Sequence, residues 1–225
     1  MKYSINAAIS PHAAAALMIS DEIDLSSSWA ASTSEIVLTQ LLKLQISEIL
    51  SIVDNQEHEE SADIKDIPQF GSIEMLIRVP YYFIQTGQSV VDYPQLGFFL
   101  KNDIDASLEA NTKFGENHGK GAAILGLVNC KGTRFVPSSV TNSFCTRTEA
   151  QQAEIIKRLC FRIPIVQLII SNAKSGMVNG YYPMREYSES TRHRRGQCLR
   201  AIFKAMREYN NDELNYRLDN IIWED

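Results

Sequence analysis

The chain has 225 residues, of which 44% are hydrophobic and 22% are charged, and its formal net charge is −5. These values are ordinary for a folded globular protein and exclude wholesale disorder, a collagen-like repeat and a disulfide-stapled miniprotein. No apolar run reaches the roughly 18 residues of a membrane-spanning helix, and the first 30 residues make a poor secretory signal. We therefore expect a cytoplasmic protein without a membrane partner. The cysteines form no CxxC pair, which favours neither a zinc site nor disulfides; they are Cys130, Cys145, Cys160 and Cys198.

The charge is distributed unevenly along the chain. Residues 1–70 hold eleven acidic side chains and three basic ones, whereas residues 113–204 hold fifteen basic side chains and five acidic ones. Residues 208–225 are acidic again, with six acids and one arginine. A basic middle between two acidic segments predicts contact with a polyanion such as a nucleic acid.

Residues 34–54 carry apolar side chains at helical spacing and predict one long helix, for which Ser34 is the N-cap. The apolar side chains cover more than one face of this helix, which is typical of burial or of contact with a second chain. The following residues 55–66 are acidic and polar, as expected for a loop or linker. We therefore expect residues 1–70 to form an acidic N-terminal helical segment that binds a protein partner or a second copy of the chain.

Residues 72–82 are rich in β-branched and aromatic side chains, which favours an extended strand limited by Pro80. Three short helices are predicted next, and a β-hairpin whose turn contains glycine follows them. The helices begin at Asp92, at Ser107 and at about Glu116, with a tight turn at Gly115 between the second and the third, and the hairpin covers residues 127–136.

This order of elements is that of a winged helix-turn-helix module, in which the third helix enters the major groove of DNA and the hairpin forms the wing. We therefore predict that residues 71–145 form a first winged helix. Gly119 and Gly121 weaken the helix that contains them but permit a close backbone approach. The predicted base-reading residues are Asn117, His118 and Lys120, and the predicted phosphate contacts of this module are Lys113, Lys131 and Arg134.

A second unit follows in residues 146–225. Residues 149–173 have a strong helical pattern that Pro164 divides, and residues 192–207 form the most basic run of the chain, with the spacing of an amphipathic helix. Residues 216–223 are compatible with a strand or a wing edge, so this unit resembles a second, less regular winged helix. The predicted fold class is mainly α with small β-hairpins (α+β), as a tandem winged helix-turn-helix plus an N-terminal helical segment. The DNA contacts predicted on the basic helix are Arg192, Arg194, Arg195, Arg200 and Lys204.

Two stretches resemble winged-helix modules of bacterial restriction and antiphage defence proteins. The first is the run of residues 113–120 that leads into Leu125-Gly126-Leu127-Val128, where a helix of those modules ends before its wing. The second is the pattern Thr191-x-x-Arg194-Arg195, which is similar to their downstream basic helix. The resemblance spans about residues 73–210 and implies a recognition or accessory subunit of a restriction or antiphage system. The chain departs from those proteins in having no attached nuclease domain, so the resemblance leaves open whether this chain cleaves DNA.

Signatures of catalysis are scarce in the sequence. No GxSxG, Walker-type or GxGxxG loop occurs and no two histidines are four residues apart, so we predict no catalytic residue, metal or cofactor. The leading prediction is a protein that binds double-stranded DNA without catalysis of its own. Two alternatives remain open: a protein-interaction subunit whose winged helices serve as partner platforms, and a small Mg²⁺-dependent nuclease subunit that uses Asp54, Asp63 and Lys65.

Overall fold

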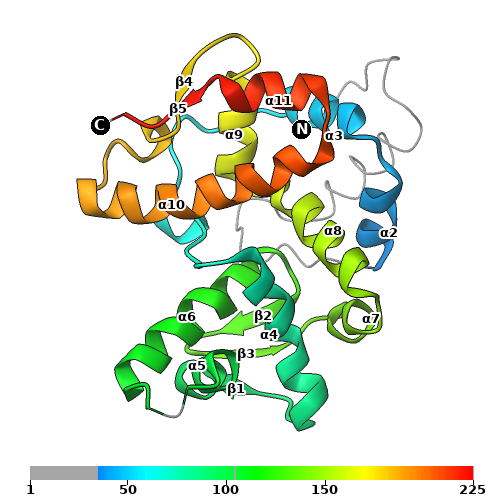
Figure 1. Cartoon of the computed structure of the whole chain (residues 1–225), viewed down its shortest axis with the longest axis vertical. Coiled ribbons are helices and arrows are strands. Elements are labelled where there is room, and N and C mark those ends of the chain that lie inside the picture. Colours follow the sequence, from blue (N-terminus) through cyan, green and yellow to red (C-terminus); the bar gives the residue numbers. More distant parts are fainter. Residues whose placement is uncertain (1–34, 104, 225) are drawn as a thin grey trace.

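In this computed structural model, which describes residues 35–103 and 105–224, the chain is mainly helical and has two small β-sheets (Figure 1). The predicted α+β class is therefore confirmed. Figure 1 shows a lower body around the three-stranded sheet and an upper body of helices, and one continuous hydrophobic cluster runs through both. The lower body contains α4 (Ile73–Thr86), α5 (Tyr93–Lys101) and α6 (Leu108–Ile124), and the upper body contains α9 (Pro164–Asn172), α10 (Glu189–Met206) and α11 (Asp212–Asp219).

The predicted N-terminal helix is divided into α2 (Glu35–Lys43) and α3 (Ile46–Asp54) by a break at Leu44. The break is stabilised by a side chain from outside the helix. The Arg158 guanidinium donates hydrogen bonds to the carbonyl oxygen of Leu44 at 2.6 Å and to that of Leu41, in the last turn of α2, at 2.5 Å. Carbonyl groups at a helix end have no partner within the helix and need one elsewhere. The prediction of a single helix is therefore wrong, and its predicted cap, Ser34, lies outside the described residues.

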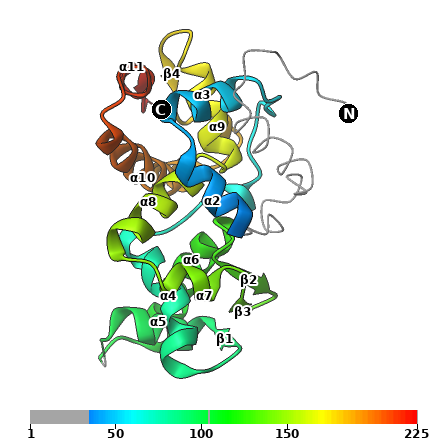
Figure 2. The same ribbon diagram turned by 90° about the vertical axis from the view of Figure 1, so that its right-hand side faces the viewer.

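Helices α2 and α3 lie against the C-terminal helices: α2 contacts α8 (Glu149–Cys160), and α3 contacts α9 and α11 (Figure 2). The apolar side chains that predicted a partner are thus covered largely by this chain, although Ile36 is 63% exposed. No single described helix is long and apolar enough to cross a membrane. Helices α2 and α3 reach that length and composition only as a pair, and they meet at a bend of 112°.

Residues 72–82, predicted as a strand, belong to the helix α4. Ser72 caps this helix, because its side-chain oxygen accepts a hydrogen bond from the backbone N–H of Met75 at 3.3 Å, and Gly87 ends it with a φ of 67°. The strand prediction is wrong because burial of one helical face outweighs the β-propensity of the individual residues. The buried residues of α4 are Leu76, Val79, Pro80, Tyr82 and Phe83.

The second and third predicted helices are one continuous helix, α6, which Gly115 does not interrupt. Gly115 lies where α6 crosses α5, and a Cβ atom there would be 1.9 Å from the carbonyl oxygen of Tyr93. A Cβ atom on Gly97 of α5 would likewise be 1.8 Å from a carbonyl oxygen of α6, so only glycine permits this backbone contact. The predicted tight turn is therefore a close helix crossing, whereas the predicted helix starts at Asp92 and Ser107 are confirmed as N-caps.

The predicted hairpin is confirmed: β2 (Val128–Lys131) and β3 (Arg134–Pro137) pair antiparallel, and Gly132 in their turn has a φ of 62°. A further strand, β1 (Val91–Asp92), pairs antiparallel with the other edge of β3, so the sheet order is β1-β3-β2. Strand β1 lies between α4 and α5 in the chain. The lower body therefore has the order helix, strand, helix, helix, strand, strand.

The C-terminal unit consists of helices and a small parallel strand pair. The predicted division at Pro164 is confirmed, since this residue opens α9 after the end of α8. Residues 216–219, predicted as part of a strand, belong to α11, and only β5 (Ile221–Ile222) is extended, in parallel pairing with β4 (Val178–Asn179). The remaining described elements are α7 (Thr141–Cys145) and the short 3₁₀ helices Ile64–Asp66, Tyr182–Met184 and Arg207–Tyr209.

Candidate nucleic-acid interface

Helix α10 carries the most basic run of the chain on an amphipathic helix, as predicted, and no acidic residue occurs within residues 190–207. Its cations do not share one face, because a helix turns by about 100° per residue and this places Arg195 and Arg200 about 140° apart. The Arg200 guanidinium lies 5.1 Å from the ring of Trp223. Arg200 and Lys204 therefore lie on the flank of α10 that is turned away from Arg195. Arg194 lies between the two flanks, about 100° from Arg195 and about 80° from Lys204.

Three arginines lie in the first turns of α10. Arg192 is half-buried and donates to the carbonyl oxygen of Tyr187 at 2.9 Å. Arg195 is half-buried as well and donates to the carbonyl oxygen of Ile67 at 2.5 Å; burial lowers its pKa, and the charge of Arg194 lowers it further. Arg194 is exposed, and no carboxylate in the described part of the chain lies within ion-pair distance of it. Of the three, Arg194 is the best placed to meet an external anion.

The exposed side of α6 carries a carboxylate between two lysines. The two oxygens of Glu116 accept hydrogen bonds from Lys113 Nζ at 3.3 Å and from Lys120 Nζ at 2.8 Å. The hydrogen bond from Lys120 holds the pKa of Glu116 below its usual value, although burial opposes this. Lys120 Nζ also lies 5.7 Å from the centre of the Tyr93 ring, and Asn117 is half-buried beside Glu116. Both predicted lysine contacts of α6 thus have a carboxylate partner.

His118, which we predicted to read bases, is a packing residue with an exposure of only 2%. Its Nε2 accepts a hydrogen bond from the backbone N–H of Gly71 at 3.3 Å, and its Nδ1 lies 2.9 Å from the carbonyl oxygen of Phe114, which assigns the proton to Nδ1. Burial lowers the pKa of the imidazole and so favours the neutral form. This corrects the predicted set, because the ring ties α6 to residues 67–71 and does not reach the surface.

The glycines near the end of α6 also serve packing. A Cβ atom on Gly119 would be 2.2 Å from the ring of Phe135, and one on Gly121 would be 2.7 Å from the ring of Phe70. Both glycines are buried. The close approach predicted at these positions is therefore made by the protein's own aromatic rings.

The hairpin presents two exposed cations, Lys131 at the end of β2 and Arg134 at the start of β3. Within residues 35–103 and 105–224, neither has a carboxylate at ion-pair distance. The turn between them is held by Tyr93, whose hydroxyl donates to the carbonyl oxygen of Gly132 at 3.1 Å. Because Lys120 lies against the same tyrosine ring, the hairpin and α6 are joined at this point.

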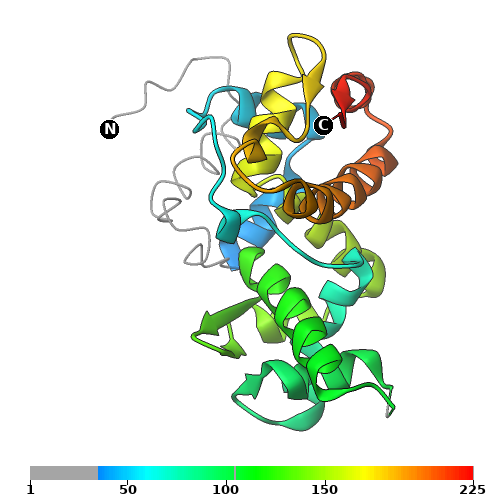
Figure 3. The ribbon, with the colours of Figure 1, turned by 90° about the vertical axis from the view of Figure 1, so that its left-hand side faces the viewer.

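The three cationic elements are neighbours in the fold, with the hairpin and α10 on opposite sides of α6 (Figure 3). Figure 3 shows α6 across the front of the lower body, the hairpin beside it and α10 above it. Arg195 of α10 lies close enough to Glu116 of α6 for that carboxylate to act on its pKa, and Tyr93 links α6 to the hairpin. We call this surface the cationic face; it consists of Lys113, Glu116, Asn117, Lys120, Lys131, Arg134, Arg194 and Arg195.

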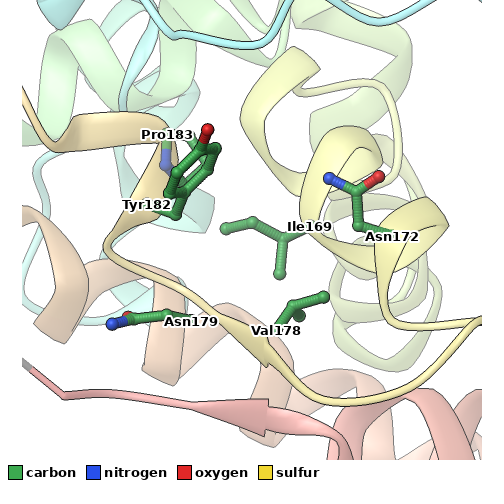
Figure 4. Close-up of a pocket in the computed structure, with 6 residues that line it drawn as sticks. All are labelled: Ile169, Asn172, Val178, Asn179, Tyr182 and Pro183. Atoms are coloured by element: carbon green, nitrogen blue, oxygen red, sulfur yellow. The ribbon is translucent and has the colours of Figure 1, made fainter.

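Two hollows lie outside the cationic face. A pocket of about 170 Å³ lies between α9, β4 and the following turn. The Asn179 amide is hydrogen-bonded to the backbone of Tyr181 and Glu224, and Figure 4 shows the Tyr182 hydroxyl pointing away from the pocket. A groove of about 1290 Å³ between α4, α5, α8 and the first turn of α6 is larger, and Phe98 and Leu108 in its lining are 51% and 73% exposed. The small pocket offers no acid–base pair, and the lining of the groove is mixed, with charged side chains such as Glu74 and Arg78 beside the exposed apolar ones. The residues that line the small pocket are Ile169, Asn172, Val178, Asn179, Tyr182 and Pro183.

The carboxylates considered for a nuclease have cationic partners. Asp54 lies 2.6 Å from Arg217 and 2.7 Å from Lys174; burial raises its pKa, but the hydrogen bonds from these two residues leave it below its usual value. Asp63 lies in a turn, where Lys65 Nζ is 3.0 Å away. Among the described residues, no group of three or more His, Cys, Asp or Glu side chains is arranged to hold a metal ion.

Glu116 and the link from Arg195 to Ile67 are parts of the interface that we did not predict from the sequence. The spacing of Lys113, Glu116 and Lys120 is a known signal for ion pairs on one helix. Because a turn is predicted at Gly115, the sequence pattern places Lys113 on a different helix from Glu116 and Lys120, and the shared ion pairs are not predicted. The link from Arg195 joins residues 128 positions apart, and no local pattern indicates such a contact.

Comparison of the chain with protein families, with curated proteins and with solved structures finds no match. The function is therefore inferred from geometry and charge.

Proposed function

We propose that the chain binds double-stranded DNA through the cationic face, with residues 71–145 as a winged helix. The order of elements and the sheet order β1-β3-β2 support this fold, with α6 in the place of the recognition helix and the β2–β3 hairpin in the place of the wing. The observation that carries the proposal is that α6 is joined to the hairpin through Tyr93 and lies next to the first turns of α10 (Figure 3).

The cations of this face divide into two groups by their partners. Lys131, Arg134 and Arg194 are exposed and have no carboxylate partner among the described residues, so they suit phosphate contacts, which position a protein on the duplex. Lys120 and Asn117 lie on the side of α6 that would face the major groove, where base edges carry the sequence information.

Helix α10 supplies the second recognition element in this proposal. The unit of residues 146–225 resembles a winged helix in its basic helix, while β4 and β5 form a parallel pair in place of a hairpin. The resemblance to restriction and antiphage modules supports a role as the recognition or accessory subunit of such a system, with catalysis on another chain.

The salt dependence of duplex binding tests the proposal. Fluorescence anisotropy with a short labelled duplex, between about 50 and about 200 mM salt, measures a slope of log affinity to which each phosphate contact adds about 0.9. We expect binding at low salt, and we expect Arg194→Ala to lower the slope by about 1. The matched control is Arg207→Ala, because Arg207 is an exposed cation at the other end of α10 that already pairs with Asp219 at 2.7 Å. Absence of binding at the lowest salt, or equal slopes for wild type and Arg194→Ala, would contradict the proposal.

An interaction platform is the second candidate function, and the groove between α4, α5 and α8 favours it. Exposed apolar side chains that gather in one groove, here Phe98 and Leu108, are typical of surfaces that bind proteins. Stable co-purification of another chain, together with no measurable duplex affinity at low salt, would favour this candidate over DNA binding.

A further inference from the structure

Glu116 is the acidic member of the cationic face, and it lies in the middle of α6. Lys113 and Lys120 hold its two oxygens at 3.3 and 2.8 Å, and its side chain is 22% exposed. Two ion pairs restrict the rotamers of the carboxylate, while the partial exposure keeps it within reach of a ligand. An anionic acceptor is thus held in place where the proposed DNA contact occurs.

The chemistry of this group determines what it can bind. The hydrogen bond from Lys120 keeps the pKa of Glu116 below its usual value, so the carboxylate is ionised near neutral pH and only accepts hydrogen bonds. A DNA phosphate offers acceptor oxygens and a negative charge, and Glu116 therefore repels it. In the major groove, the hydrogen-bond donors are the exocyclic amino groups of cytosine and adenine.

Building on the proposed function, we propose that Glu116 is a specificity-determining residue that accepts a hydrogen bond from the exocyclic amino group of a cytosine or an adenine. Each carboxylate oxygen has more than one lone pair, so the oxygens that bind Lys113 and Lys120 can each accept a further donor. The lysines flank Glu116 as donors, and they match the acceptors that lie beside an amino group in the major groove.

The same carboxylate lowers the affinity of α6 for DNA of arbitrary sequence. Lys113 and Lys120 compensate Glu116 and are therefore less available to phosphates. The phosphate contacts fall mainly to the hairpin and α10. Specificity is a difference between affinities, and a group that repels the wrong contact increases it.

Selection of bound duplexes from a randomised pool, followed by sequencing, tests this assignment. The proteins are the wild type, Glu116→Gln, Glu116→Leu and the matched control Glu109→Gln, which removes an exposed acid from the first turn of α6. We expect the wild type and Glu109→Gln to enrich cytosine or adenine at one position of a common motif. If the base is cytosine, Glu116→Gln should lose the preference at that position and keep the rest of the motif. If the base is adenine, the glutamine amide can still pair with N6 and N7, so the preference should survive Glu116→Gln and be lost in Glu116→Leu, which has no acceptor. Enrichment of cytosine or of adenine at that position shows which of the two bases donates the hydrogen bond to Glu116.

The salt slope on a duplex outside the selected motif gives a second measurement. Glu116→Gln frees two lysines, so we expect its slope to be steeper by about 1–2 than that of the wild type. An unchanged motif in Glu116→Leu and an unchanged slope in Glu116→Gln would overturn the role of Glu116 and leave the proposed function in place. A wild-type protein that binds no duplex would overturn the proposed function, and the role of Glu116 with it.

Discussion

Arg217 is a deeply buried charged side chain, with an exposure of 1%, and two carboxylates balance its charge. Its guanidinium donates to the two oxygens of Asp54 at 2.6 and 2.9 Å and to Glu213 at 2.5 Å. Because Asp54 ends α3 and Arg217 lies in α11, this ion pair fastens the N-terminal helices to the C-terminal unit. A buried charge is costly unless it is paired, so the cluster is stable only as a whole.

Replacement of Arg217 by methionine is therefore expected to lower the free energy of unfolding by about 3–5 kcal/mol, because Asp54 would keep its charge without its main partner. Urea unfolding at neutral pH measures this change. The matched control is Arg207→Met, which removes an exposed ion pair with Asp219 and should cost less than about 1 kcal/mol. Equal unfolding midpoints for the two variants would show that the buried pair contributes no more than the exposed one.

The stability of the protein should also fall in acid. The pKa of Asp54 is lower in the folded state than its usual value, so the unfolded chain takes up the proton first. The contribution of Asp54 is then complete above the unfolded pKa of about 3.9 and is lost as the pH falls through the folded value. We expect Arg217→Met to show a weaker loss of stability over this range in urea unfolding at a series of pH values. If the free energy of unfolding has the same pH dependence in the wild type and in Arg217→Met, this role of the ion pair is contradicted.

His118 should stay neutral to a lower pH than an exposed histidine. Burial lowers its folded pKa, so the proton enters the unfolded chain first and the contribution of His118 to stability is lost as the pH falls below about 6.5. An NMR titration of the histidine rings measures this pKa directly. A value at or above about 6.5 would contradict the dominance of burial over the hydrogen bond to Phe114 in setting this pKa.

At the scale of single residues, the sequence indicated which side chains are basic but not what lies against them. Arg194 and Lys131 are exposed as expected, whereas His118 is buried by a segment 47 positions away. Helical spacing reports which face of a helix is apolar, and it carries no information on the element that covers that face. This is why His118 was placed at the surface and Arg195 was not connected to Ile67.

At the scale of helices and strands, the ends of elements follow local chemistry and their continuity follows packing. Asp92 and Ser107 were predictable as N-caps, and Pro164 as a helix start, because each acts on its immediate neighbours. The sequence pattern predicts a strand in place of α4 and two helices in place of α6, because the continuity of both helices depends on partners elsewhere in the chain. A glycine within a helical pattern is typical of a helix break, whereas Gly115 lies inside α6 and permits its close crossing with α5.

Gly115→Ala should therefore destabilise the protein by about 1–3 kcal/mol, because the added Cβ atom would overlap the carbonyl oxygen of Tyr93. Urea unfolding of this variant measures the loss. The control is Gly71→Ala, whose Cβ atom would lie 3.8 Å from His118 Nε2, an ordinary contact distance. If the two variants are equally stable, α5 and α6 are further apart than the structure places them.

The hairpin and the far flank of α10 should differ in their effect on DNA binding. Lys131→Ala/Arg134→Ala removes two cations of the cationic face, so we expect the salt slope to fall by about 2. Arg200→Ala/Lys204→Ala removes the same charge from the flank of α10 turned away from Arg195, and we expect a smaller effect. A larger effect from the α10 pair would place the duplex on the other side of α10.

At the scale of the whole molecule, the cationic face crosses from the lower body to the upper one. Helix α6 and the hairpin belong to the lower body, and α10 belongs to the upper body (Figure 1). Residues 67–71 run between them, since the Ile67 carbonyl binds Arg195 and the Gly71 N–H binds His118. The shared hydrophobic core and this segment together set the spacing of the cations that a duplex would meet.

Chemical modification of lysine and arginine side chains, with and without bound duplex, tests most directly whether these elements act as one surface. Mass spectrometry after acetylation and phenylglyoxal treatment reads each side chain separately. We expect the duplex to protect Lys120, Lys131 and Arg194, which represent the three elements, and to leave the exposed residues Lys43 and Arg207 reactive. Protection of only one element, or equal protection of Lys43 and Arg207, would contradict a single DNA-binding face.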